Sequence, residues 1–451
     1  MTKQKKLIQS YIGLLLLAIL LPQFIAGCGS SEPNVKIDPP GDEIGNEWVV
    51  YEVYPGFYEK GKSFNAISNQ LDNIKALGVN VLWLMPIYEE GVLKGIGSPY
   101  CIRDYKKVNS DYGTIDELKF LVSKAHDKGM KVIFDWVANH TSWDNAWTQN
   151  KDWYTQDSNG NIVSPPGMGW NDVADLNFNN NNMRKEMIAA MSYWINELNI
   201  DGYRCDYAEG VPDDFWEEAI SELKKIKGDD LLMLAEGGKA SLLANGFDML
   251  YAWDFAYRLQ DLYAGKITVN NLYETHYQEY KDVPAGKQRM RYTTNHDMSS
   301  QQTPIQAYKG EKGAISAFVI ATTLGGSPMI YSSQEVGYPT QLSFFNFINI
   351  DWNSNQSYKN EYKKIMDIYT SSDALKKGSL RTFENGKVAT YVRKSQKETI
   401  LILVNTANEQ FEAKIPIEFS QENMINLLTN SVEKMPSVLT LEPYQYKILK
   451  I

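Results

Sequence analysis

The feature that most constrains the fold of this chain is a regular alternation of short apolar runs with longer amphipathic segments, beginning at Glu47. Several of the short runs are apolar almost throughout, which is typical of strands covered on both faces, as in a parallel sheet. Eight such runs predict strands, and they lie at residues 48–54, 79–85, 131–136, 201–206, 231–236, 247–251, 290–295 and 328–332.

The segments between these runs predict helices. Residues 64–77 carry apolar side chains at helical spacing and are followed by Gly78, a typical C-terminal stop. Residues 114–128 begin with the capping-box pattern Thr-Ile-Asp-Glu, and residues 183–198 and 315–324 have similar helical patterns. Repeated strand–helix units predict a (β/α)8 TIM barrel over residues 47–379, with functional side chains at the C-terminal strand ends.

Two segments depart from the repeat. Residues 141–175, after the third strand, are polar and rich in Trp and Asn, and we expect this short insertion to fold over the site. From residue 380 to residue 451 the pattern changes to alternating runs separated by turn residues. This predicts a C-terminal antiparallel β-sandwich domain.

The N-terminus predicts export. Lysines at positions 3, 5 and 6 precede an apolar run at 11–25, and small residues stand before Cys28. The local sequence Ile-Ala-Gly-Cys resembles a bacterial lipobox, so we expect a signal peptide over 1–28, lipid attachment at Cys28 and a flexible tether over 29–46. The alternative is an uncleaved membrane anchor. Both interpretations predict an exported protein held at a membrane. For a lipoprotein we expect this to be the outer membrane, with the protein on its periplasmic or cell-surface face.

The net charge limits the classes of ligand that the protein can bind, and the cysteine count indicates whether it has disulfides. The formal net charge of -10 argues against nucleic acid, whose phosphates need a basic face, and we expect a neutral or cationic ligand and a monomer. Besides Cys28, the chain has Cys101 and Cys205. Two cysteines do not make a disulfide framework, so we expect buried free thiols.

Charged and polar side chains gather at the predicted strand ends. Asp135, Arg204, Asp206 and Glu236 close three of the strands, and the segment Asn295-His296-Asp297 closes a fourth. Any one carboxylate alone could equally belong to a structural ion pair. Carboxylates on several adjacent strand ends suit glycosidic bond cleavage, which needs a nucleophile and an acid.

The environments of two carboxylates predict different roles. Arg204 and Asp206 are two residues apart on a strand and therefore share a face, so the guanidinium should lower the pKa of Asp206 and keep it ionised. Glu236 follows the apolar run Leu-Leu-Met-Leu-Ala, which should raise its pKa toward that of a working acid.

These residues carry a family resemblance. The segments Asp-Trp-Val-Ala-Asn-His at 135–140, Gly-Tyr-Arg-Cys-Asp at 202–206, Ala-Glu at 235–236 and Thr-Asn-His-Asp at 294–297 resemble the four ordered motifs of the α-amylase superfamily, glycoside hydrolase family 13. The resemblance implies Asp206 as nucleophile, Glu236 as acid/base and Asp297 as the third carboxylate. It also implies a set of substrate-binding residues, namely Tyr100, Asp135, His140, Arg204 and His296.

The resemblance leaves calcium and substrate as open questions. Asn139 and Asp175 match positions of the family's calcium site, whereas Gly210 replaces a histidine often found there. The ordinary alternative is that Asn139 and Asp175 tie the insertion to the barrel by hydrogen bonds. We expect a retaining hydrolase of α-1,4-glucosidic bonds in starch-type glucans or malto-oligosaccharides. The alternatives are a neopullulanase, an α-glucosidase, a transglycosylase or a non-catalytic glycan-binding lipoprotein.

Overall fold

A computed structural model describes residues 47–451 of the chain. The predicted signal peptide, the lipid attachment at Cys28 and the tether lie outside the described residues. Within residues 47–451, no helix has the length and apolar character needed to cross a membrane. Cys101 and Cys205 are buried free thiols, as the sequence predicted.

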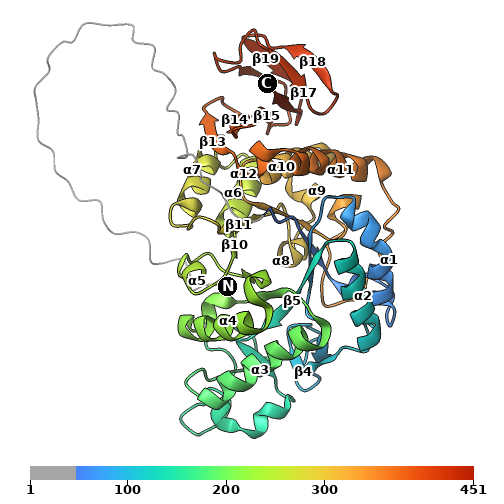
Figure 1. Ribbon diagram of the computed structural model, residues 1–451, viewed down its shortest axis with the longest axis vertical. Helices are drawn as coiled ribbons and strands as arrows, with labels where there is room; N and C mark the ends of the chain where they lie inside the picture. Colours follow the sequence, from blue (N-terminus) through green and yellow to red (C-terminus); the bar gives the residue numbers. More distant parts are fainter. Residues whose placement is uncertain (1–46) are drawn as a thin grey trace, which may run out of the picture. The chain divides into compact units, whose positions relative to one another are not determined.

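Eight parallel strands close into a barrel, which confirms the predicted fold (Figure 1). Around the barrel each strand pairs with its neighbours in the order β1-β12-β11-β10-β9-β8-β5-β2. The strands are β1 (Val50–Val53), β2 (Val81–Leu84), β5 (Lys131–Val137), β8 (Gly202–Asp206), β9 (Leu232–Ala235), β10 (Met249–Tyr251), β11 (Gln288–Arg291) and β12 (Ser327–Tyr331).

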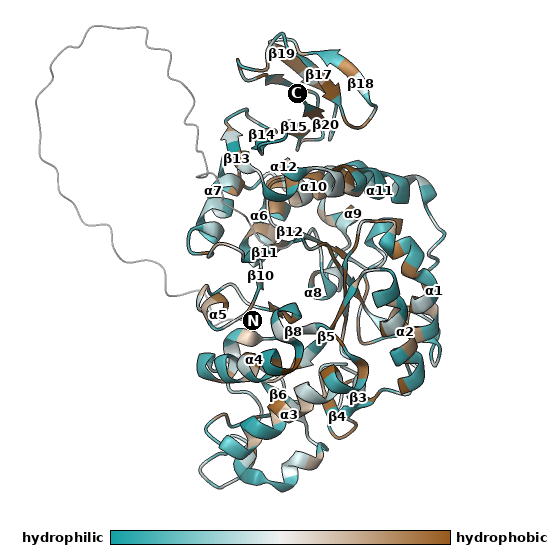
Figure 2. Ribbon diagram, in the orientation of Figure 1, coloured by the Kyte–Doolittle hydropathy of each residue, from teal (hydrophilic) through white to brown (hydrophobic). Residues whose placement is uncertain are grey.

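Helices surround the strands, and their apolar stripes pack against the barrel. Helix α2 begins with the predicted capping box, because the side chain of Thr114 accepts from the backbone N–H of Glu117 and Glu117 bonds back to Thr114. Figure 2 shows mainly hydrophilic residues on the visible outer surfaces of α1 and α4. The main helices are α1 (Ser63–Lys75), α2 (Ile115–Asp127), α3 (Asn181–Leu198), α4 (Asp213–Lys227), α6 (Trp253–Tyr263), α7 (Val269–Tyr280), α10 (Glu311–Thr323) and α11 (Gln356–Ser371).

The seventh barrel strand lies earlier than its apolar pattern suggested. The sequence predicted a strand over 290–295, whereas β11 spans Gln288–Arg291 and the short helix α8 (His296–Ser299) follows. The strand begins with polar side chains that are buried and paired: Arg289 donates to the carbonyl of Glu279, and Arg291 to that of Gly325. Buried, paired arginines interrupt the apolar pattern by which a buried strand is predicted, so the start of this strand was missed.

The start of β8 requires a glycine. Gly202 has φ of +147°, and a Cβ there would lie 1.9 Å from the carbonyl oxygen of Leu232 on the neighbouring strand. Only a residue without a side chain allows this approach. The strand that carries Arg204 and Asp206 therefore pairs tightly with the strand that leads to Glu236.

The predicted insertion after β5 is built from short elements. Strand β6 (His140–Ser142) pairs antiparallel with β7 (Val173–Asp175), and the 3-10 turns η2 (Ala146–Gln149) and η3 (Lys151–Trp153) lie between them. The other short elements are β3 (Tyr88–Glu90), β4 (Ile102–Val108), α5 (Ser241–Ala244), α9 (Pro304–Ala307), α12 (Asp373–Lys377) and the 3-10 turns η1 (Pro55–Phe57), η4 (Ala208–Gly210), η5 (Gly228–Asp230) and η6 (Gln334–Val336).

The C-terminal region forms antiparallel sheets around its own apolar core, as predicted. It is joined to the barrel helices by hydrogen bonds: Tyr273 donates to the carbonyl of Thr390, and Arg393 to that of Leu324. Its six-stranded sheet consists of β13 (Ser379–Phe383), β14 (Val388–Lys394), β15 (Thr399–Asn405), β20 (Tyr446–Lys450), β17 (Asn423–Asn426) and β18 (Ser431–Lys434), with β16 (Phe411–Lys414) and β19 (Val438–Leu441) as a separate pair.

Candidate active site

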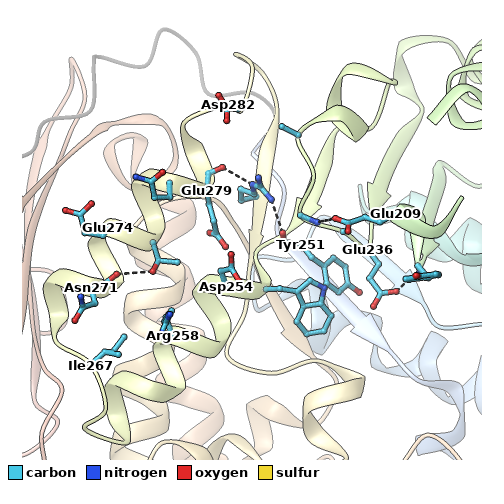
Figure 3. A pocket seen from close by; sticks show the side chains of 18 residues that line it. Glu209, Glu236, Tyr251, Asp254, Arg258, Ile267, Asn271, Glu274, Glu279 and Asp282 are labelled. Carbon is cyan, nitrogen blue, oxygen red and sulfur yellow. Dashed lines mark hydrogen bonds between the residues drawn. The ribbon is translucent and has the colours of Figure 1, made fainter. Parts of the chain in front are cut away.

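Two cavities meet at the C-terminal ends of the barrel strands. The smaller, of about 230 Å³, is lined by Asp206, Asp297 and His296 among others. The larger, of about 960 Å³, extends along α6 and α7 and is drawn in Figure 3. Tyr207 and Glu236 line both cavities, so these two residues mark the boundary between them.

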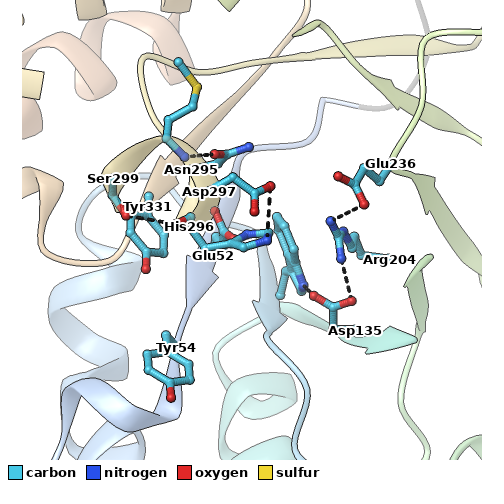
Figure 4. A network of polar contacts seen from close by, with 12 residues as sticks. Glu52, Tyr54, Asp135, Arg204, Glu236, Asn295, His296, Asp297, Ser299 and Tyr331 are labelled. Atoms are coloured by element: carbon cyan, nitrogen blue, oxygen red, sulfur yellow. Dashed lines mark hydrogen bonds and ion pairs between the residues drawn. The ribbon is translucent and has the colours of Figure 1, made fainter. Parts of the chain in front are cut away.

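The guanidinium of Arg204 joins three of the predicted carboxylates, and Figure 4 shows its contacts with two of them, Asp135 and Glu236. Its Nη1 lies 2.7 Å from Asp135 and 3.0 Å from Asp206, and its Nη2 lies 2.9 Å from Glu236. The side chains of Arg204 and Asp135 are fully buried, whereas Asp206 and Glu236 are 13% and 19% exposed. Arg204 therefore holds the two partly exposed carboxylates at fixed positions facing the cavities.

Aromatic side chains enclose this cluster of charges. Trp83 donates its indole N–H to Asp135 at 3.1 Å, and Arg204 donates to the hydroxyl of Tyr251 at 3.1 Å. The guanidinium carbon of Arg204 lies 5.0 Å from the ring centre of Trp83 and 5.4 Å from that of Tyr251. Hydrogen bonds and cation–π contacts thus compensate for burying the charges.

Glu236 is also held by the backbone of the segment after β8. Tyr207 has φ of +41° and ψ of +47°, a left-handed conformation that is unusual for a residue with a side chain. In this conformation its N–H donates to Oε2 of Glu236 at 2.8 Å. Local backbone strain next to the strand end is therefore used to orient the predicted acid.

His296 joins the other side of the smaller cavity to this network. Its Nδ1 bonds Glu52 at the end of β1, and its Nε2 lies 2.9 Å from the hydroxyl of Tyr100 and 3.4 Å from Asp297. Tyr100 in turn donates to Asp135 at 3.2 Å. A continuous chain of hydrogen bonds thus runs from β1 to β5 below the cavity.

His140 lies in the wall formed by the insertion. Its Nε2 lies 3.3 Å from the carbonyl oxygen of Tyr100, and its Nδ1 lies 3.3 Å from the amide of Asn139. Because a carbonyl only accepts, Nε2 carries the proton. Trp170 packs edge-on against His140 and Tyr207, with ring centres 5.5 and 5.3 Å away, so the insertion covers the site as expected.

Protonation behaviour differs between the key groups. Burial and the negative charge of Asp206 together raise the pKa of Glu236 to about 7, although the positive charge of Arg204 acts to lower it. Burial lowers the pKa of His140 to about 4. Burial also lowers the pKa of His296, but the carboxylates of Asp297 and Glu52 raise it to about 9. At neutral pH, His140 is therefore neutral and His296 cationic.

The pKa of Asp206 departs from the sequence-based expectation. Arg204 does lower it, but burial is the larger influence, and the charges of Asp135 and Asp297 act with burial, so the pKa rises to about 6. The prediction of a lowered value was wrong because it counted the nearest charge and not the loss of water. Asp206 is still mostly ionised at pH 7, whereas Glu236 is about half protonated.

The structure brings together every predicted catalytic and substrate-binding residue, and it adds residues that the sequence analysis missed. Glu52, Trp83 and Tyr251 lie in or at the ends of barrel strands and bond directly to predicted site residues. Glu52 was the lone carboxylate in the run Val-Val-Tyr-Glu-Val-Tyr, and an acidic residue in a strand buried on both sides was the signal that could have revealed it.

The two candidate calcium ligands lie on neighbouring segments in the structure. The N–H of Leu176 bonds the carbonyl of Asn139, and β7 places Asp175 beside His140. Calcium needs six to eight oxygen ligands. Within residues 47–451 no group of three or more His, Cys, Asp or Glu side chains could hold a metal ion. Calcium binding stays a prediction.

Comparison with known proteins adds independent evidence. The family model described as "Alpha amylase, catalytic domain" matches residues 52–165 and 167–423. The chain belongs to the α-amylase family. It is therefore a glycoside hydrolase, and the family's catalytic domain accounts for the barrel and for part of the C-terminal region.

Individual relatives are similar along most of their length. The chain is 24% identical to α-amylase 3 of Dictyoglomus thermophilum, covering 89% of this chain and 93% of the relative, and 25% identical to a cyclomaltodextrinase of Thermoanaerobacter pseudethanolicus, covering 86% and 71%. Among solved structures, a noncanonic maltogenic α-amylase from Thermotoga neapolitana superimposes with a TM-score of 0.81 at 26% identity, covering 90% of this chain and 98% of that one.

Proposed function

We propose that this α-amylase family member is a retaining hydrolase of α-1,4-glucosidic bonds in starch-type glucans or malto-oligosaccharides. The observation that carries the proposal is the contact of Arg204 with both Asp206 and Glu236, two carboxylates that face the cavities and differ in pKa. A retaining mechanism needs one ionised and one protonated carboxyl group at the same bond.

In the first step, Asp206 attacks the anomeric carbon and forms a covalent ester. The bond from that carbon to the glycosidic oxygen breaks, and Glu236 gives its proton to the leaving oxygen. Asp297, at the mouth of the smaller cavity, is 41% exposed and lies 3.4 Å from the cationic His296. In the proposal it binds sugar hydroxyls and stabilises the positive charge that develops on the ring.

In the second step, Glu236 acts as a base. It takes a proton from water, the water oxygen attacks the anomeric carbon, and the ester bond to Asp206 breaks. The carboxylate of Asp206 and the proton on Glu236 are then restored. Neutral His140 donates to the carbonyl of Tyr100 and so fixes the wall of the smaller cavity where the sugar ring would bind.

Product analysis over time on soluble starch, pullulan and maltotriose tests this proposal. Early release of mixed oligosaccharides from starch would support cleavage of internal α-1,4 bonds. Release of glucose alone would favour an α-glucosidase, and release of panose from pullulan would favour a neopullulanase. Products longer than the substrate would favour a transglycosylase. No release from any of them would favour a glycan-binding protein. Parallel reactions with a chelator, and with calcium added back, test the calcium prediction.

We also propose that the enzyme is an exported monomer held at a membrane by a lipid on Cys28. The lipobox-like sequence and the polar segment over 29–46 support this proposal. Such a tether would keep the barrel near the membrane while leaving its cavities open to soluble glucans.

A further inference from the structure

The loop that follows Glu236 contains two successive glycines. After β9 the chain continues as Glu236-Gly237-Gly238-Lys239, and the single turn of α5 begins at Ser241. Glycine lacks the side chain that restricts backbone rotation, so a sequence of this kind gives the backbone wide conformational freedom. A general acid must instead stay at hydrogen-bonding distance from the oxygen that it protonates. The position of the acid therefore depends on contacts that hold this loop in place.

The side chain of Glu209 makes such contacts from the neighbouring strand end. Its Oε1 accepts hydrogen bonds from the backbone N–H of Gly238 at 2.5 Å and from that of Lys239 at 2.9 Å. Figure 3 shows Glu209 and Glu236 on the same side of the larger cavity. Hydrogen bonds from N–H groups to a carboxylate are stronger than those between neutral groups. One carboxylate oxygen thus fixes two successive peptide units of the loop.

The contact between Glu209 and the loop requires a glycine at position 237. A Cβ on Gly237 would lie 2.6 Å from Cγ of Glu209 and 3.0 Å from Cδ1 of Leu242. A Cβ on Gly238 would have its nearest neighbour, on Arg289, at 3.8 Å, which is an ordinary contact distance. The side chain of Glu209 therefore occupies the space that a side chain at position 237 would need, and only glycine allows this approach.

The turn that carries Glu209 is itself fixed to the barrel. Trp216, which is fully buried on α4, donates its indole N–H to the carbonyl of Ala208 at 2.9 Å. The N–H of Ala208 in turn bonds the carbonyl of Glu236 at 3.1 Å, and the N–H of Tyr207 bonds the carboxylate of Glu236. Three successive residues of this turn thus bond the segment that begins at Glu236. Glu209 extends these contacts beyond the acid itself.

We propose that Glu209 is a positioning residue, which holds the loop after Glu236 and so keeps the acid at the leaving oxygen. The proposal rests on the proposed function. Glu209 lines the larger cavity, but its Oε1 accepts the two backbone bonds and its Oε2 lies 3.9 Å from the ammonium group of Lys239. Without these contacts Glu236 would transfer its proton less efficiently, whereas the attack by Asp206 would be unchanged.

The test compares two substrates whose leaving groups have nearly the same size but differ in basicity. 4-Nitrophenyl α-maltoside releases a weakly basic phenolate that needs little proton transfer, whereas 4-methoxyphenyl α-maltoside releases a more basic one that needs the acid. In the full-length protein, Glu209→Ala should lower kcat/KM for the methoxyphenyl substrate by at least about tenfold and for the nitrophenyl substrate by less than about threefold. A side chain that bound the leaving group directly would affect both substrates equally.

Two further variants test the contact itself. Glu209→Gln keeps an oxygen that can accept the two N–H bonds, so it should restore kcat/KM for the methoxyphenyl substrate to within about threefold of the wild type. Gly237→Ala should act in the same direction as Glu209→Ala, because the added Cβ displaces the side chain of Glu209. Glu222→Ala, at a carboxylate that is 47% exposed on α4, is the matched control and should change neither substrate's value.

Maltoheptaose provides an independent readout. On this substrate Glu209→Ala should lower kcat by at least about tenfold and change KM by less than about twofold, since the variant impairs proton transfer and not binding. Equal losses on the two maltosides, no loss on the methoxyphenyl substrate, or a rise in KM with kcat unchanged would overturn the proposal. A wild-type enzyme that cleaves neither the maltosides nor maltoheptaose would instead overturn the proposed function.

Discussion

Glu52 and His296, which are 244 positions apart in the sequence, form an ion pair in the interior of the barrel with side chains 0% and 2% exposed. The pair joins the end of β1 to the segment that carries Asp297. Oε2 of Glu52 has no hydrogen-bond partner within the described residues, so this carboxylate acts through a single oxygen. The ion pair fixes the ring of His296, whose other nitrogen faces Tyr100 and Asp297.

Replacing Glu52 by Gln should lower the pKa of His296 from its value of about 9, because one of the two carboxylates that raise it is removed. NMR titration of the histidine side chains can measure this change. We also expect kcat/KM to fall by roughly ten- to a hundredfold, since the ring and Asp297 lose their fixed orientation. An unchanged pKa of His296 in this variant would contradict the role given to Glu52.

Arg204→Met should strongly destabilise the fold. The change leaves the carboxylates of Asp135, Asp206 and Glu236 close together without their shared cation, and Asp135 is fully buried. Breaking a buried pair in this way costs about 3–5 kcal/mol. Chemical denaturation should show this loss, whereas Lys363→Met, which breaks an exposed pair with Asp367 on α11, should cost under about 0.5 kcal/mol. Equal stabilities for the two variants would show that Arg204 does not hold the cluster together.

Asp206→Asn should abolish most turnover while leaving the fold intact. The amide keeps the size of the carboxylate but cannot form the covalent ester, so kcat should fall by at least about a thousandfold. Circular dichroism and thermal denaturation check the fold. Asp367→Asn, at an exposed aspartate on α11, is the matched control and should keep the full activity. Substantial turnover by Asp206→Asn on maltoheptaose would assign the nucleophile elsewhere.

Much of the fold and site could be predicted because the relevant signals are local. Short buried strands, the capping box at Thr114 and the charged strand ends at Asp135, Arg204 and Glu236 are visible in a few consecutive residues. A family resemblance then supplied roles for the strand-end residues. These signals do not depend on how distant segments meet.

The missed features depend on distant partners or on burial. Glu52 became recognisable only when His296 was placed beside it, and β11 was misplaced because its arginines are buried against α7 and the turn at Gly325. The pKa of Asp206 was predicted in the wrong direction because a sequence shows the neighbouring charge of Arg204 but not the loss of solvent.

Cys28→Ser should release the enzyme from the membrane. If the thiol of Cys28 carries the lipid, the wild-type protein will partition into the detergent phase of a Triton X-114 extraction and will incorporate labelled fatty acid. The serine variant should do neither. Ser31→Ala, in the predicted tether, is the matched control and should behave as the wild type. A membrane-bound serine variant without label would favour the uncleaved anchor instead.

The dependence of kcat/KM on pH should be a narrow bell. Asp206 must be ionised to attack, so activity should rise as the pH passes about 6; Glu236 must be protonated for the first step, so activity should fall above about 7. Because the two carboxyl groups interact, the pKa values read from the two limbs belong to the pair and not to either residue alone. Initial rates on maltoheptaose at low substrate concentration, from pH 4 to pH 10, measure both limbs.

The variant Glu236→Gln tests whether Glu236 is the group whose loss of a proton causes the fall in activity on the alkaline side. On α-maltosyl fluoride the leaving group needs no proton, so formation of the covalent ester should persist in this variant without a fall near pH 7. Hydrolysis of the ester then lacks its base, and added azide, which needs none, should restore turnover and give a maltosyl azide of retained configuration. If the fall near pH 7 survived in Glu236→Gln, another group would control it, and the assignment of Glu236 as the acid would be wrong.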